Sequence, residues 1–156
     1  DELGVELLGA RVDVIRRAHA RFPRVVVAVL SNSDKHPLMG PEERVALIRE
    51  SLAEVPGVEV TSFAGLLVDF MRQCGARVLL RGMRAVSDFE YEFQLALMNR
   101  RLWDEVETVF LTPTEEFTYL SSRVIKEIWT VGGNVDGLVP PPVARALDAL
   151  RSAGAR

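Results

Sequence analysis

The chain has 156 residues, 48% of them hydrophobic and 26% charged, with a formal net charge of -3 at pH 7. These values are typical of one globular domain over residues 1–156, and the acidic balance argues against broad nucleic-acid binding. The one cysteine, Cys74, excludes a disulfide framework and favours a reducing compartment, by default the cytoplasm. No apolar run reaches the roughly 20 residues of a membrane span, and the acidic start of the chain lacks the order of a signal peptide. We therefore expect a soluble, unprocessed protein without a membrane partner.

The first predicted elements are a helix and a buried strand. Residues 1–10 show no clear period, but from Arg11 apolar residues recur at helical spacing until Pro23 ends the helix. Residues 25–30, VVVAVL, form an apolar run without alternation, which is typical of a strand covered on both faces. A polar loop, residues 31–39, follows this strand.

The rest of the chain continues the alternation of helices and strands. Pro41 and the two glutamates after it suit the first turn of a helix, and residues 58–63 alternate like a strand nearer a sheet edge. A further helix ends at Gly75, a residue that favours helix C-termini. The remaining predicted elements are a strand at 78–80, a long helix to about 99, a strand at 108–111, a helix at 121–131 and a C-terminal helix after the prolines at 140–142.

This alternation predicts an α/β fold with a doubly wound parallel sheet, because parallel strands are usually joined by crossover helices. Ligands of such sheets bind outside the carboxyl ends of the strands. Three loops are expected there, residues 31–39, 81–85 and 112–122. Together they contain firm positive charges and hydroxyls that suit a ligand with several phosphates: Lys35, Arg81, Arg84, Ser121 and Ser122.

Simpler interpretations of these residues remain open. Serines at a helix start are common caps, and an isolated loop lysine is usually solvated. Arg81 and Arg84 could pair with Asp88 or Glu92. Glu92 could instead accept a hydrogen bond from a ribose or an adenine amine. No His, Cys or carboxylate cluster predicts a tightly bound metal, although Mg²⁺ carried by a nucleotide is compatible with the sequence.

Residues 81–100, RGMRAVSDFEYEFQLALMNR, strongly resemble bacterial phosphopantetheine adenylyltransferases. The resemblance extends over residues 12–150 and includes PEERVAL at 41–47, GLLVDF at 65–70, LSS at 120–122, KEI at 126–128 and GGNV at 132–135. It implies a Rossmann-like nucleotidyltransferase domain that transfers adenylyl from ATP to 4′-phosphopantetheine. The products would be dephospho-coenzyme A and pyrophosphate.

The resemblance also implies roles for individual residues. Lys35 and Arg81 would hold the phosphate end of phosphopantetheine, and Leu67 would line the pantetheine path. The residues implied at ATP are Gly82, Met83, Arg84, Glu92, Phe117, Thr118, Tyr119, Leu120, Ser121 and Ser122. Further implied partners are Mg²⁺ with ATP, coenzyme A or dephospho-coenzyme A, and further copies of the chain in a homohexamer, with the apolar face of the helix at residues 89–98 contributing contacts.

The chain departs from the family at its start and at Arg123, where the family has a small hydroxyl residue. The family begins with a strand and a loop ending in a Gly-His pair, whereas this chain has Ala10 and Arg11 at that position. A missing first strand would remove the centre of the sheet and expose two neighbouring strands along their edges. Either the chain lacks its natural N-terminal segment or Arg11 replaces the catalytic histidine, and the intact remainder of the site favours the first. In the second case the protein could be a catalytically impaired homologue that binds ATP or coenzyme A.

Overall fold

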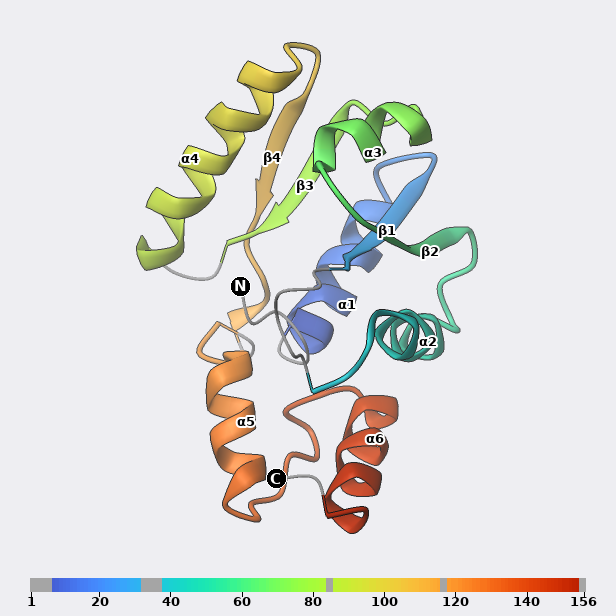
Figure 1. Cartoon of the computed structure of the whole chain (residues 1–156), viewed down its shortest axis with the longest axis vertical. Helices are drawn as coiled ribbons and strands as arrows, with labels where there is room; N and C mark the ends of the chain where they lie inside the picture. The colour runs from blue at the N-terminus through green and yellow to red at the C-terminus, as the bar shows by residue number, and fades with distance from the viewer. Residues whose placement is uncertain (1–6, 32–37, 84–85, 116–117, 155–156) are drawn as a thin grey trace.

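The computed structural model describes residues 7–31, 38–83, 86–115 and 118–154, without the side chains of residues 7–11 and 86–87. Helices and strands alternate through these ranges as the sequence predicts (Figure 1). The elements in chain order are α1 (Leu7–His19), β1 (Val25–Leu30), α2 (Pro41–Ser51), β2 (Val58–Phe63), α3 (Leu67–Cys74), β3 (Val78–Gly82), α4 (Val86–Leu102), β4 (Glu107–Leu111), α5 (Ser122–Thr130) and α6 (Pro141–Ser152).

All four described strands are in parallel pairs, which confirms the α/β class. β1 pairs with β2 from Val25 opposite Val58 onwards, and β3 pairs with β4 from Val78 opposite Glu107 onwards. The pairs form two separate two-stranded sheets, and among the described residues no strand pairs with both β1 and β3. The separation matches the expectation for a fold in which the described residues contain no strand between β1 and β3.

Helix α1 lies where it contacts both sheets. It packs against β1 and against β3, and it also touches α2. It begins at Leu7, before the predicted start at Arg11, and ends at His19, before Pro23. Because α1 contacts a strand of each sheet, its position is coupled to both halves of the fold.

Two apolar clusters stabilise the described parts of the chain. The larger cluster joins β1, β2, α2, α5 and α6, and its most buried members are Ile125, Val143 and Leu147. Within it, the indole Nε1 of Trp129 donates a hydrogen bond to the Leu147 carbonyl at 3.0 Å, so the ring is buried without an unpaired donor. The smaller cluster is centred on Val68, Met71 and Val106 under α3.

The local stop signals act as the sequence predicts. Gly75 ends α3 with φ of 68°, in the left-handed region that costs glycine little. Pro41 stands in the first turn of α2, followed by Glu42 and Glu43. None of the described helices combines the length and the apolar character that a membrane crossing requires.

Candidate active site

The carboxyl ends of β3 and β4 form the edge on which the candidate site is built. Gly82, the last residue of β3, lies opposite Leu111, the last residue of β4. The Met83 N–H continues the pairing with a 2.9 Å hydrogen bond to the Leu111 carbonyl. The loops that follow the two strands therefore leave the sheet side by side, although Gly82 and Leu111 are 29 positions apart in the chain. Two of the three predicted loops are thus brought together, but the strand is longer than predicted, so that Arg81 and Gly82 belong to β3 and not to the loop.

Arg81 and Glu92 form the best-defined polar contact at this edge. The Arg81 Nε donates to Glu92 Oε2 at 2.7 Å, and its Nη2 donates to Oε1 at 2.6 Å. The side chains are 25% and 13% exposed, so the pair is shielded from water on most sides. A two-bond fork of this kind fixes the plane of the guanidinium as well as its position. Of the roles considered for Glu92, the structure shows that of orienting an arginine.

The start of α5 provides the second polar element. The Ser121 hydroxyl accepts a hydrogen bond from the Val124 N–H at 3.1 Å, with the extended backbone expected of a cap. Ser122 is buried at 5% exposure, and the Leu120 side chain before the cap is buried in the larger cluster. Helix capping therefore accounts for Ser121. The positive end of the helix dipole still faces the loop.

The loop between β4 and α5 is partly closed on itself. The Thr118 hydroxyl donates to the Thr114 carbonyl at 3.2 Å, and the Thr118 N–H donates to the Glu115 carbonyl at 3.1 Å. Tyr119 is 71% exposed, which makes its ring accessible to a ligand. The described part of this loop is thus a compact turn beside the start of α5.

The other predicted site residues differ in their setting. Leu67 is the first residue of α3 and is half-buried against the smaller cluster. It therefore has a packing role in the fold, whether or not it also contacts a ligand. Apart from its two chain neighbours, no described residue has an atom within 4 Å of the position that a Cβ would take on Gly82, so the described part of the chain leaves that strand end open to a ligand. Arg123 is exposed and pairs with Glu127 at 3.0 Å. Lys35, Arg84 and Phe117 lie outside the described residues, and of Arg11 the structure describes the backbone in α1 but not the side chain.

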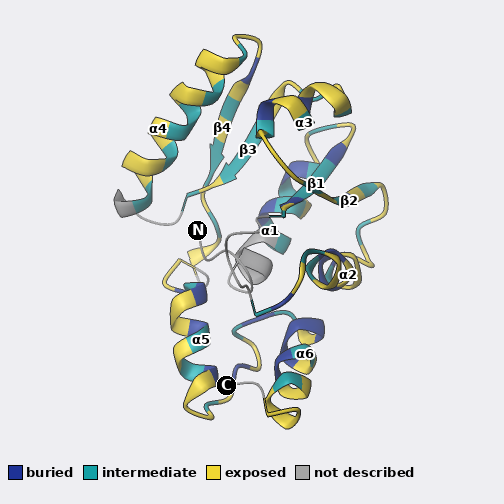
Figure 2. Cartoon of the chain, viewed as in Figure 1, coloured by how far each residue is buried: buried dark blue, intermediate teal, exposed yellow. Residues whose placement is uncertain are grey.

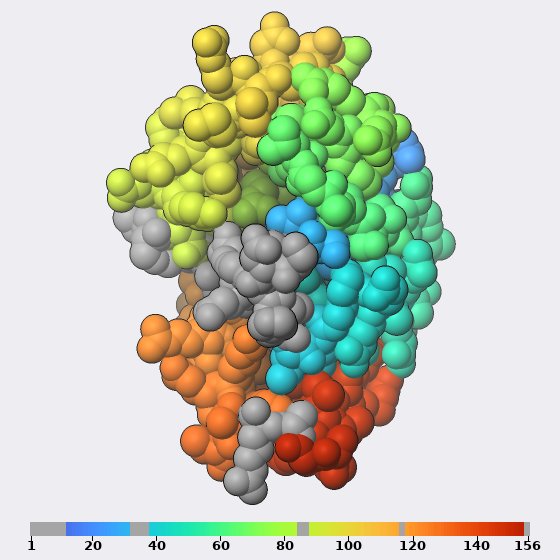
Figure 3. All heavy atoms as spheres, in the orientation of Figure 1, coloured from blue at the N-terminus to red at the C-terminus, as the bar shows by residue number. Residues whose placement is uncertain are grey.

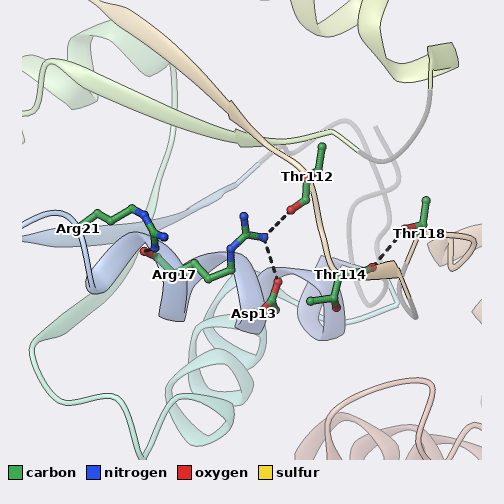
Figure 4. A network of polar contacts seen from close by, with 6 residues as sticks. All are labelled: Asp13, Arg17, Arg21, Thr112, Thr114 and Thr118. Carbon is green, nitrogen blue, oxygen red and sulfur yellow. Dashed lines mark hydrogen bonds and ion pairs between the residues drawn. The ribbon is translucent and has the colours of Figure 1, made fainter.

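Arg17 is a residue that sequence reasoning did not assign to the site. Figure 4 shows its side chain reaching from α1 to the residue that follows β4. Its Nη1 donates to the Thr112 carbonyl at 2.6 Å and lies 3.4 Å from Asp13 Oδ2. The spacing of Asp13 and Arg17 by four residues is a signal that the sequence carries. No sequence signal predicts the contact with Thr112, because it joins residues 95 positions apart.

Comparison with known proteins gives consistent relationships over most of the chain. A family model described as Cytidylyltransferase-like matches residues 10–128. A phosphopantetheine adenylyltransferase of Alkalilimnicola ehrlichii is 53% identical over 90% of this chain and 82% of its own length. The protein of the same name from Thioalkalivibrio sulfidiphilus is 52% identical over 92% of this chain and 90% of its own length. A third, from Geotalea daltonii, is 49% identical over 88% of this chain and 86% of its own length.

Proposed function

The chain belongs to the phosphopantetheine adenylyltransferase family, within the cytidylyltransferase-like nucleotidyltransferases, and we propose on this basis that it transfers adenylyl from ATP to 4′-phosphopantetheine. The products are dephospho-coenzyme A and pyrophosphate, which places the reaction in coenzyme A synthesis. The structural observation that carries the proposal is the Arg81–Glu92 fork at the carboxyl end of β3. It presents an oriented guanidinium at the edge where α/β sheets bind their ligands.

The reaction needs positioning more than it needs a protein nucleophile. An oxygen of the substrate phosphate attacks the α-phosphorus of ATP in line, a new P–O bond forms, and the bond to the bridging oxygen of the β-phosphate breaks. The protein must hold two anions close together and stabilise the charge on the five-coordinate phosphorus. A site built from guanidinium groups and a helix N-terminus supplies both functions.

We assign the phosphate of phosphopantetheine to Arg81 and Lys35, with Leu67 beside the pantetheine arm. Glu92 accepts one N–H from Nε and one from Nη2 of Arg81, so Nη1, which turns away from Glu92, is the main donor assigned to the phosphate, beside the second N–H of Nη2. The fork fixes the direction of Nη1 before the substrate arrives, which lowers the entropy cost of binding. Glu92 therefore belongs to the site through Arg81, in addition to any contact it makes with the nucleotide.

We assign ATP to the ends of β3 and β4 and to the start of α5. The residues of this assignment are Gly82, Met83, Arg84, Phe117, Thr118, Tyr119, Leu120, Ser121 and Ser122. Mg²⁺ would enter bound to the phosphates of ATP, as it commonly does in phosphoryl-transfer sites. Arg11, at the position of the family's histidine, would add a positive charge near these phosphates.

The proposal is tested by measuring pyrophosphate release from ATP, Mg²⁺ and 4′-phosphopantetheine, with dephospho-coenzyme A identified by mass spectrometry. We expect turnover by the wild type and a loss of roughly 10-fold or more in kcat/KM for Arg81→Gln, because the substrate phosphate loses a charged donor. Arg101→Gln, an exposed arginine in the last turn of α4, is the matched control and should change little. ATP binding without turnover would point to the impaired homologue, and the absence of any binding would contradict both functions. Of these two functions, the names of the three relatives support the active enzyme.

We further propose that the chain assembles with copies of itself into a homohexamer through α4. Apolar side chains are exposed along this helix, which carries yellow, exposed positions over much of its length (Figure 2). In the space-filling view, α4 forms one margin of the molecule (Figure 3). The exposed side chains are Phe89, Tyr91, Phe93, Leu97, Met98 and Leu102, each at least 45% exposed. Apolar patches of this kind mark interaction sites more often than free surface.

Sedimentation velocity tests the assembly. The wild type should sediment as a hexamer, and Leu97→Glu should give smaller species because a buried charge opposes the contact. Glu90→Gln, on the same helix, is the control and should leave the assembly intact. A monomeric wild type would contradict the proposal. We also propose a cytoplasmic location for the protein, which cell fractionation tests.

A further inference from the structure

We propose that Arg17 is a positioning residue that sets the start of the nucleotide-binding loop between β4 and α5. The inference rests on the proposed function, because that function assigns ATP to this loop. It concerns a residue outside the resemblance motifs at the carboxyl ends of the strands. The contact that carries it is the hydrogen bond from the Arg17 Nη1 to the Thr112 carbonyl, 2.6 Å long (Figure 4).

The bond acts at the point where the loop leaves the sheet. Thr112 directly follows Leu111, the last residue of β4, whose own carbonyl is held by the Met83 N–H. The carbonyls of Leu111 and Thr112 therefore accept hydrogen bonds from two different parts of the chain, the residue after β3 and helix α1. A charged donor makes the stronger kind of hydrogen bond, and a carbonyl deprived of it must find water or move.

The far end of the loop has its own anchors. Leu120 is buried in the larger cluster, and Ser121 caps α5. The described bonds between these ends, from Thr118 to Thr114 and to Glu115, lie within the loop. Arg17 is therefore the described side chain that ties the start of the loop to another element of the fold.

Helix α1 gives Arg17 a fixed base. Asp13, one turn earlier and 23% exposed, lies 3.4 Å from the same Nη1, and the Arg17 carbonyl accepts a hydrogen bond from Arg21 at 2.8 Å. The helix itself packs against β1 and β3. Groups held on regular elements by several contacts place their partners more precisely than loop side chains do. Through Arg17, the position of α1 thus determines where the loop begins.

The neighbouring Arg16 offers a matched control. It is on the same helix turn, but its guanidinium is 53% exposed and lies 3.9 Å from the 91% exposed Glu54. Such an exposed pair contributes little. Arg16→Gln and Arg17→Gln therefore make the same chemical change at adjacent positions, with and without loss of the contact with Thr112.

The experiment measures kcat and both KM values by pyrophosphate release, the Kd for ATP by calorimetry, and Tm. For Arg17→Gln we expect the KM and Kd for ATP to rise about 10-fold, in proportion to a charged hydrogen bond lost. The KM for phosphopantetheine should stay within about 2-fold. Arg17→Lys, which retains a positive donor, should recover part of the loss, and Arg16→Gln should match the wild type.

Two results would overturn the inference: equal ATP affinity in Arg16→Gln and Arg17→Gln, or a lower Tm for Arg17→Gln with unchanged ATP affinity. The second would show that the contact serves stability alone. An inactive wild type would count against the proposed function, but the Kd for ATP would still decide the role of Arg17. The two failures are therefore distinguishable.

Discussion

Arg81 at the end of β3 and Glu92 in α4 are joined by two hydrogen bonds of 2.7 and 2.6 Å, in a setting where both side chains are mostly buried. The pair links a strand end to the helix that follows it across 11 residues of chain. It also places a negative charge beside the guanidinium proposed to bind a phosphate. The Glu92 carboxylate therefore has two opposite effects on phosphate binding. It weakens the electrostatic attraction because it reduces the net charge of the site, and it fixes the plane of the Arg81 guanidinium.

Glu92→Gln tests which of these two effects on phosphate binding is larger. The amide loses the charge and can accept only one strong bond from Arg81, so the guanidinium becomes free to rotate. We expect the KM for phosphopantetheine to rise by roughly 10-fold and the free energy of unfolding to fall by about 1–3 kcal/mol. Steady-state kinetics and urea unfolding measure the two effects.

Glu90→Gln is the control for this variant, since Glu90 is an exposed carboxylate on the same helix. Its kinetics and unfolding should match those of the wild type. A lower KM for phosphopantetheine in Glu92→Gln would refute the positioning role, because it would mean that the carboxylate mainly repels the substrate.

Ser121→Ala removes the cap of α5. The Val124 N–H loses its acceptor, and we expect a loss of about 1 kcal/mol in the free energy of unfolding. Chemical denaturation followed by circular dichroism measures it. Ser152→Ala, which removes a hydroxyl bonded to a carbonyl in the last turn of α6, is the comparison and should cost less. Equal losses would show that the cap contributes nothing specific.

Gly133→Ala should destabilise the turn after α5. A Cβ at this position would lie 2.6 Å from Ile128 Cγ2 and 2.9 Å from the Ile128 carbonyl oxygen, so backbone as well as side chain would have to move. We expect a loss of about 1–3 kcal/mol, the usual cost of overpacking, measured as a lower urea midpoint. At Gly40 an added Cβ would meet no atom of the described residues within 4 Å. Gly40→Ala should therefore lower the free energy of unfolding less than Gly133→Ala does. A larger loss at Gly40 would contradict the explanation by overpacking.

The pair of Arg24 and Glu59 predicts a pH dependence. Bonds of 2.6 and 3.0 Å from Arg24 lower the pKa of Glu59. A carboxyl with a lowered folded-state pKa stabilises the fold above its unfolded pKa, and this contribution disappears as the pH falls through the folded value. Glu59→Gln should therefore reduce stability at neutral pH and flatten its decline in acid.

Thermal unfolding between neutral pH and the acid limb checks this expectation. Both side chains are 54% exposed, so the difference should be small and should shrink in salt. Glu54→Gln, at a position 91% exposed, should retain the acid profile of the wild type. A steeper acid limb in Glu59→Gln would show that the sign is wrong.

The sequence by itself determined the class of fold, the order of the helices and strands, and the family, while several element ends differ by one to four residues from those predicted. The strands at 25–30 and 58–63 have the predicted bounds, because an apolar run or a strict alternation is a local consequence of how side chains project from a strand. Gly75 ends α3 for an equally local reason, its freedom to adopt positive φ. The motif at residues 81–100 indicated the reaction that the relatives' names support.

Only the tertiary structure decided which groups meet. It selected Glu92 as the partner of Arg81, and it brought Arg17 to a carbonyl 95 positions away. It also divided the four described strands into two parallel pairs, with α1 against both. Sequence patterns record the period of a helix or a strand, but such partners depend on how whole elements pack. The Arg81–Glu92 fork and the Arg17–Thr112 bond follow from that packing, and no local pattern specifies either of them.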